Sequence, residues 1–125
     1  MKSANPTVVI IDDDNGVRNS VRFLLELDGF AVEDFGSAAS FFSKCDLENI
    51  DCLIVDQSMP ETTGLTLTAQ LRAIGSKLPV ILITALPDPE IIEQARGVGI
   101  YKVLRKPFPD NVLPKLILEA IAAKP

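Results

Sequence analysis

The sequence predicts an α/β fold in which a doubly wound, five-stranded parallel sheet carries helices on both of its faces. Three observations favour this class. A short apolar run, a turn rich in Asp, Ser, Pro or Gly, and a stretch of helical periodicity follow one another five times in 125 residues. The apolar runs are continuous, as in parallel strands that are buried on both faces. Repeated strand and helix units of this kind build parallel sheets covered by helices.

The first two strands are expected over residues 7–11 (TVVII) and 30–35 (FAVEDF). The helix between them has helically spaced apolar residues on one face and ends at Asp28-Gly29. Ser37 is a typical capping residue, so a short helix should follow the second strand. The inner face of the first helix is expected to consist of Val17, Val21, Leu24 and Leu25.

The remaining strands are expected over residues 52–56 (CLIVD), 78–84 (LPVILIT) and 101–104 (YKVL). Asp88-Pro89-Glu90 combines a capping side chain, a proline and an acidic first turn, which predicts a helix start. Pro114 fits the last helix if that helix begins at about Asp110 or Asn111, where its missing N–H falls in the unbonded first turn. The apolar faces of the last three helices are expected to consist of Leu67, Leu71 and Ile74; of Ile91, Ile92, Ala95 and Val98; and of Val112, Leu113, Leu116, Ile117, Ala120 and Ile121.

Length and charge narrow the range of functions. The length fits one domain with a core over residues 7–122, and residues 123–125 could begin a linker. The formal charge of −5 argues against a free-standing nucleic-acid binder, which would concentrate Lys and Arg. No apolar stretch reaches the roughly 20 residues of a membrane span, so we expect a cytoplasmic protein.

The sequence has two cysteines, Cys45 and Cys52, and no histidine. They form neither a zinc site nor a redox motif, and we expect two reduced, half-buried thiols.

Polar residues stand at the carboxyl ends of four predicted strands. Asp12-Asp13-Asp14 follows the first strand, Asp56 ends the third, Thr84-Ala85 ends the fourth, and Lys106 follows the fifth. Parallel α/β sheets bind their ligands at this edge. Two like charges about 4 Å apart repel by roughly 4 kcal/mol at an effective dielectric constant near 20. A divalent cation removes this repulsion, and Mg²⁺ prefers such oxygen ligands.

A metal ion, a carboxylate nucleophile, a hydroxyl and an ammonium group together form a site for phosphoryl transfer.

Two neighbouring positions are not expected to take part in phosphoryl transfer. Asp14, or Asn15 beside it, is expected to cap the helix that opens at Gly16-Val17. Arg18 is expected to face solvent and receives no role.

The motifs, in their order and spacing, resemble the receiver domain of two-component response regulators. They are the acidic pair after the first strand, the segment IVDQSMPETTG, Ile83-Thr84-Ala85 and Lys106-Pro107-Phe108. The resemblance runs from Val8 to Ala122. It implies the flavodoxin-like fold of the chemotaxis regulator, with strand order 2-1-3-4-5.

The resemblance also implies the roles of the site residues. Asp56 would accept the phosphoryl group, and Asp12, Asp13, Asp56 and the backbone carbonyl of Ser58 would hold Mg²⁺, with one of the acidic pair acting through water. Thr84 and Lys106 would bind the phosphoryl oxygens, Ala85 would leave the site open, and the Lys106–Pro107 peptide bond would be cis.

The implied partner is a sensor histidine kinase or a phosphotransfer protein. The segment DGFAV and the helix start at Ser37-Ala38 are most similar to receivers that precede a helix-turn-helix output domain in transcription regulators. DNA would be bound only through such a domain, which this sequence does not include. A homodimer could form through the fourth helix, fifth strand and fifth helix. The domain would not be an enzyme beyond catalysing its own phosphorylation and dephosphorylation.

Position 103 departs from the family pattern. The family usually has an aromatic switch residue three positions before the lysine, where this sequence has Val103. Tyr101 is two residues earlier and should share its strand face. We expect either a weakened coupling between Thr84 and this position or partial substitution by Tyr101.

Two alternative functions follow from the same residues. In the first, Asp12 would be the nucleophile of a haloacid-dehalogenase-like Mg²⁺ phosphatase, although that interpretation leaves the loop after Asp56 without a role. In the second, the receiver would be an adaptor that works without phosphorylation, with Val103 as its sign.

Overall fold

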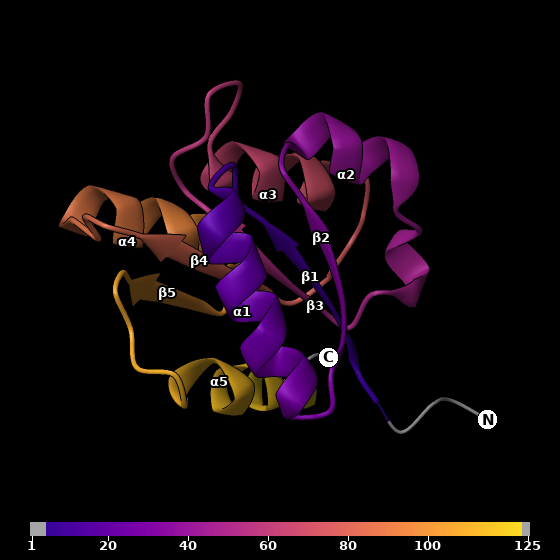
Figure 1. The fold of residues 1–125 in the computed structure, drawn as a ribbon. Helices are drawn as coiled ribbons and strands as arrows, with labels where there is room; N and C mark the ends of the chain where they lie inside the picture. The colour runs from indigo at the N-terminus through magenta and orange to yellow at the C-terminus, as the bar shows by residue number, and fades with distance from the viewer. Residues whose placement is uncertain (1–4, 124–125) are drawn as a thin grey trace.

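The computed structural model describes residues 5–123. Its five strands form one parallel sheet in the order β2-β1-β3-β4-β5, so the expected doubly wound α/β fold is confirmed (Figure 1). The elements are β1 (Thr7–Ile11), α1 (Asn15–Leu27), β2 (Ala31–Phe35), α2 (Ala38–Lys44), the 3-10 turn η1 (Leu47–Asn49), β3 (Cys52–Asp56), α3 (Gly64–Ala73), β4 (Val80–Thr84), α4 (Pro89–Gly97), β5 (Lys102–Arg105) and α5 (Val112–Ala122).

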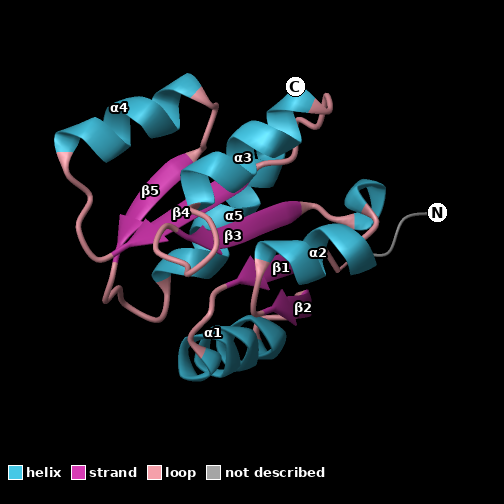
Figure 2. Cartoon of the chain, turned by 90° about the horizontal axis from the view of Figure 1, so that it is seen from above, coloured by secondary structure: helices cyan, strands magenta, loops and turns pink. Residues whose placement is uncertain are grey.

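The sheet separates two apolar cores, and for this reason the middle residues of its central strands are apolar. Alternate residues of each strand point to opposite faces. Val9 of β1 packs in the core beneath α2, α3 and α4, whereas its neighbour Val8 packs in the core beneath α1 and α5. Helices therefore cover both faces (Figure 2). The central strands β1, β3 and β4 consequently have no solvent face that polar residues could mark.

Two apolar residues do not lie where their spacing predicts. Ile74 is 66% exposed and Ile92 is 42% exposed, so the prediction that they belong to inner helix faces is wrong. Ile74 is the C-terminal cap of α3, beyond the last residue that packs on the sheet. Ile92 follows the half-buried Ile91, and one helical step turns it away from the core, where Ala95 alone of α4 is fully buried.

The two cysteines are unpaired but differ in environment. Cys45 is half-buried, as expected, whereas Cys52 lies fully inside the core. Burial raises the pKa of the Cys52 thiol to about 12. The expectation of two half-buried thiols is therefore wrong for Cys52, because it begins the central strand β3.

The start of α5 differs slightly from the expected one. The helix begins at Val112, with Asn111 before it, so Pro114 is its third residue and still lies in the unbonded first turn. Among the described residues, no helix is both long enough and apolar enough to cross a membrane.

Candidate functional site

Three carboxylates meet at the carboxyl-terminal edge of the sheet. Asp56 ends β3, and Asp12 and Asp13 directly follow β1, its neighbour in the sheet. Each of the three offers an oxygen, and these oxygens all lie within 4.8 Å of one another. Such a set of hard oxygen donors fits a divalent cation such as Mg²⁺.

Lys106 connects two of these carboxylates. Its Nζ lies 3.1 Å from Asp12 Oδ2 and 3.1 Å from Asp56 Oδ1. Burial alone would lower the pKa of Lys106, but the hydrogen bonds to Asp56 and Asp12 and their negative charges outweigh it and raise that pKa. Lys106 therefore remains a cation beside the cluster, on a Lys106–Pro107 bond that is cis, as expected.

The members of the acidic pair are not equivalent. Asp12 is fully buried, and both of its carboxylate oxygens accept hydrogen bonds: Oδ1 from the Asp14 amide at 2.9 Å and Oδ2 from Lys106. Asp13 is exposed. Asp14 caps α1 through Oδ1, which accepts from the amides of Gly16 and Val17, so its predicted capping role is confirmed.

Asp56 is buried beside other charged groups. Burial raises the pKa of its carboxyl group, the hydrogen bond from Lys106 opposes that rise, and the charges of Asp12 and Asp13 add to it.

The backbone of Asp56 has a close neighbour in Gly64, at the start of α3. A Cβ on Gly64 would lie 2.8 Å from the Asp56 carbonyl oxygen and 2.5 Å from Leu82 Cδ1. Glycine at this position therefore lets α3 approach the strand end.

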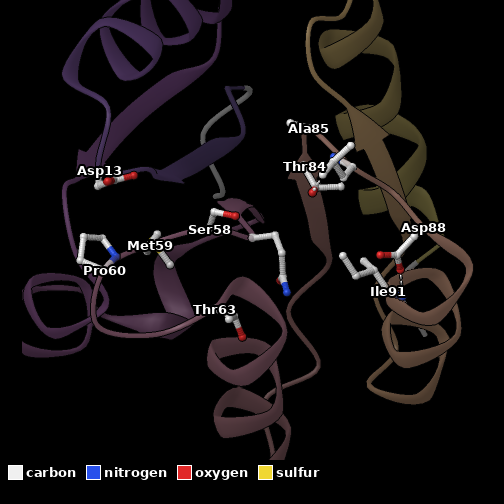
Figure 3. A pocket seen from close by; sticks show the side chains of 11 residues that line it. Asp13, Ser58, Met59, Pro60, Thr63, Thr84, Ala85, Asp88 and Ile91 are labelled. Atoms are coloured by element: carbon white, nitrogen blue, oxygen red, sulfur yellow. Dashed lines mark hydrogen bonds between the residues drawn. The ribbon is translucent and has the colours of Figure 1, made fainter.

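An open pocket of about 570 Å³ lies beside the carboxylates. In Figure 3, Asp13 and Pro60 lie on one side of it, Thr84 and Ala85 lie on another, and Ser58 lies between them. Thr84 is buried, and its Oγ1 accepts a hydrogen bond from the Leu86 amide at 3.2 Å. The predicted residues Asp13, Ser58, Thr84 and Ala85 thus share one cavity.

Val103 and Tyr101 lie away from that pocket, in a groove of about 430 Å³ between α4 and β5. Val103 is half-buried against the core, and Tyr101, just before β5, is 39% exposed. Ala95 and Arg96 of α4 also line this groove. Both residues therefore border the same groove.

Arg18 does not face solvent, so that expectation is wrong. Its side chain is only 15% exposed, and it bonds to the Asp12 carbonyl and to the carboxylate of Asp34 on β2. The sequence holds one signal for this role. Arg18 and Arg22 are one helical turn apart, directly beside the inner residues Val17 and Val21.

Comparison with known proteins defines the family to which this fold and this edge of the sheet belong. The family model of the response regulator receiver domain matches residues 8–118. The chain belongs to this family. This family assignment replaces the interpretation as a haloacid-dehalogenase-like phosphatase with Asp12 as its nucleophile.

Individual relatives refine the family assignment. The chain is 39% identical over 106 residues to the transcriptional regulatory protein FixJ of Azorhizobium caulinodans, covering 85% of this chain and 50% of that protein. It is 32% identical over 125 residues to the response regulator protein TodT of Pseudomonas putida, covering 100% of this chain and 55% of TodT. The solved structure of the response regulator StyR matches with a TM-score of 0.88 and 36% identity, covering 97% of this chain and 61% of StyR. The chain thus spans about half the length of the curated relatives it matches.

Proposed function

We propose that Asp56 is the phosphoacceptor of this receiver domain, supplied by a phosphohistidine of a sensor histidine kinase or a phosphotransfer protein. A bond would form between phosphorus and an Asp56 carboxylate oxygen while the phosphorus–nitrogen bond breaks and the imidazole leaves with the electron pair. The observation that carries this proposal is the position of Asp56, within 4.8 Å of two other carboxylates and in contact with Lys106. The domain would catalyse only this transfer and the later hydrolysis.

The proposed metal ligands are Asp12, Asp13, Asp56 and the backbone carbonyl of Ser58. Bound Mg²⁺ would neutralise the clustered carboxylates and the charge that develops on the transferring phosphoryl group. Asp13 has the accessible carboxylate of the acidic pair, whereas both oxygens of Asp12 already accept hydrogen bonds. This difference supports a direct role for Asp13 and a role through water for Asp12.

Thr84 and Lys106 are the proposed partners of the phosphoryl oxygens. The Thr84 hydroxyl accepts from the Leu86 amide, so its own proton remains able to donate to a phosphoryl oxygen. Lys106 would contribute a point charge, and its contact with Asp56 already places it beside the acceptor. Ala85, on the wall of the pocket, leaves room for the donor.

Phosphorylation is proposed to switch a downstream output through α4 and β5. A weakened coupling at Val103 or a partial substitution by Tyr101 would both be visible by NMR in the free and phosphorylated states. Substitution predicts a change of the Tyr101 ring signals, and weakened coupling predicts smaller shifts at Val103 than at Thr84. Unchanged signals at both positions would exclude them as parts of the switch.

The relatives suggest which activity the phosphorylated receiver would control. Because the chain spans about half of FixJ and TodT, we propose that it is the receiver of a transcription regulator and that a helix-turn-helix domain outside this chain binds DNA. Residues 7–122 would form the single receiver domain, and residues 123–125 could begin the linker, with 124 and 125 outside the described residues. We also propose that the domain forms a homodimer through α4, β5 and α5. Its proposed location is the cytoplasm.

Incubation with Mg²⁺ and acetyl phosphate, followed by intact mass measurement, tests the phosphoacceptor function. We expect the wild-type chain to gain one phosphoryl group, and we expect no gain in EDTA or in Asp56→Asn. A wild-type chain that gains no mass under any of these conditions would instead favour the phosphorylation-independent adaptor.

A further inference from the structure

The guanidinium of Arg18 connects α1, β2 and the start of the acidic pair. Its Nη1 donates to the Asp12 carbonyl at 2.6 Å, its Nε donates to Asp34 Oδ1 at 3.1 Å, and its Nη2 donates to Asn15 Oδ1 at 2.8 Å. All three nitrogens are thus in use on a side chain that is 15% exposed. The rigid, planar fork of arginine fixes the direction of each of these bonds.

The surroundings of Arg18 hold it in this position. Asp34 Oδ2 accepts a second ion pair, from Nη1 of Arg22 at 2.6 Å, and Arg22 also pairs with Glu26. Gly36, after β2, lies so close that a Cβ on it would be 3.1 Å from Arg18 Nη1. The two arginines and two acids cancel in charge, so this network presents a hydrogen-bond donor to the site without a net repulsion of cations.

The Asp12 carbonyl belongs to the peptide unit that joins Asp12 to Asp13. The Asp12 amide donates to the Phe35 carbonyl at 3.2 Å, so β2 and Arg18 hold the backbone of Asp12 on both sides. Within residues 5–123, Asp13 has no side-chain hydrogen bond that would place its carboxylate. The orientation of the preceding peptide unit therefore limits the directions in which this carboxylate can point.

We infer that Arg18 is a positioning residue of the proposed metal site. By fixing the peptide unit between Asp12 and Asp13, it directs the two carboxylates toward the point where they meet Asp56. This inference rests on the proposed function, because it concerns the affinity of the same site for Mg²⁺. It assigns to a residue of α1 a part in metal binding without any contact to the metal.

Titration of the full chain with Mg²⁺ alone, by isothermal calorimetry, tests this inference. We expect Arg18→Met to weaken Mg²⁺ binding by about tenfold, as is typical when a group that orients metal ligands is lost. Arg22→Met is the matched control, because Arg22 forms an ion pair with the same Asp34 but, within residues 5–123, its hydrogen bonds go to Asp34 and Glu26 and not to Asp12. It should leave the Mg²⁺ affinity within about twofold of wild type.

Arg18→Lys separates position from charge and provides a variant with a milder effect on folding. A lysine keeps the charge but not the planar fork, so the inference predicts an affinity close to that of Arg18→Met. An Arg18→Lys variant with wild-type affinity would overturn the inference. Equal affinities of Arg18→Met and Arg22→Met, with wild type binding Mg²⁺, would overturn it as well. A wild-type chain that does not bind Mg²⁺ would overturn the proposed metal site, and this inference with it.

Discussion

The substitution Asp13→Asn should stabilise the fold while removing its response to Mg²⁺. Three carboxylate oxygens lie within 4.8 Å of one another, and of these three residues Lys106 forms ion pairs with Asp12 and Asp56. Asp13 is therefore a negative charge near two others, and no cation among residues 5–123 forms an ion pair with it. Asparagine has nearly the same shape and removes this charge.

The size of the effect follows from this separation. Two unit charges 4.8 Å apart repel by about 0.9 kcal/mol in water and by about 3.5 kcal/mol at an effective dielectric constant of 20. Because Asp13 is exposed, screening by solvent favours the lower figure. We expect Asp13→Asn to raise the free energy of unfolding by about 1 kcal/mol in EDTA.

In saturating Mg²⁺, wild type should instead become more stable than Asp13→Asn. A ligand that binds only the folded state stabilises it by about 2.7 kcal/mol at 100 times its Kd. Urea unfolding of wild type should show such a gain in saturating Mg²⁺, and Asp13→Asn should lose most of it. Glu119→Gln, a change of equal charge on the exposed side of α5, should keep the full gain. The reasoning is refuted if Asp13→Asn is the less stable protein in EDTA, or if it gains as much from Mg²⁺ as wild type.

Three further predictions concern packing and the thiols. Gly64→Ala should lower the free energy of unfolding by about 1–3 kcal/mol in urea, because its Cβ would meet Leu82 and the Asp56 carbonyl; Gly97→Ala, with open space around its Cβ, should not. A thiol reagent should modify Cys45 in the folded protein and Cys52 only after denaturation, since Cys52 is fully buried; equal rates would contradict this. The Cys52 pKa of about 12 exceeds its ordinary value of 9.0, so the unfolded chain loses this proton first as pH rises. Relative to Cys52→Ala, wild-type stability should therefore be constant below pH 9 and fall by about 1.4 kcal/mol per pH unit between about 9 and 12.

The sheet could be predicted from the sequence because its strands are buried on both faces. A continuous apolar run between helix-period segments, such as residues 52–56, is typical of a strand inside a parallel sheet, and the predicted boundaries agree with β1 and β3. The edge that gathers Asp12, Asp13 and Asp56 then follows from the parallel arrangement. The caps at Asp14 and Asp88 were also predictable, because a capping bond joins residues that are close in sequence.

The predictions were wrong for residues whose position depends on contacts between segments that are far apart in the sequence. Ile74 and Ile92 have a spacing that fits an inner helix face, but periodicity does not reveal where a helix leaves the sheet. Arg18 has a long side chain, and its partners on β2 and at the end of β1 are identified only once the strand order is known. The same limit applies to Asp12, because its partner Lys106 lies 94 residues later in the sequence.

Chemical location of the phosphoryl group tests the central claim most directly. After incubation with Mg²⁺ and acetyl phosphate, borohydride reduces an aspartyl phosphate to homoserine, and peptide mass spectrometry then identifies the modified residue. The account predicts homoserine at position 56 in the wild-type chain and at no position in Asp56→Asn. Homoserine at position 12 or 13, or a modification that survives in Asp56→Asn, would contradict it.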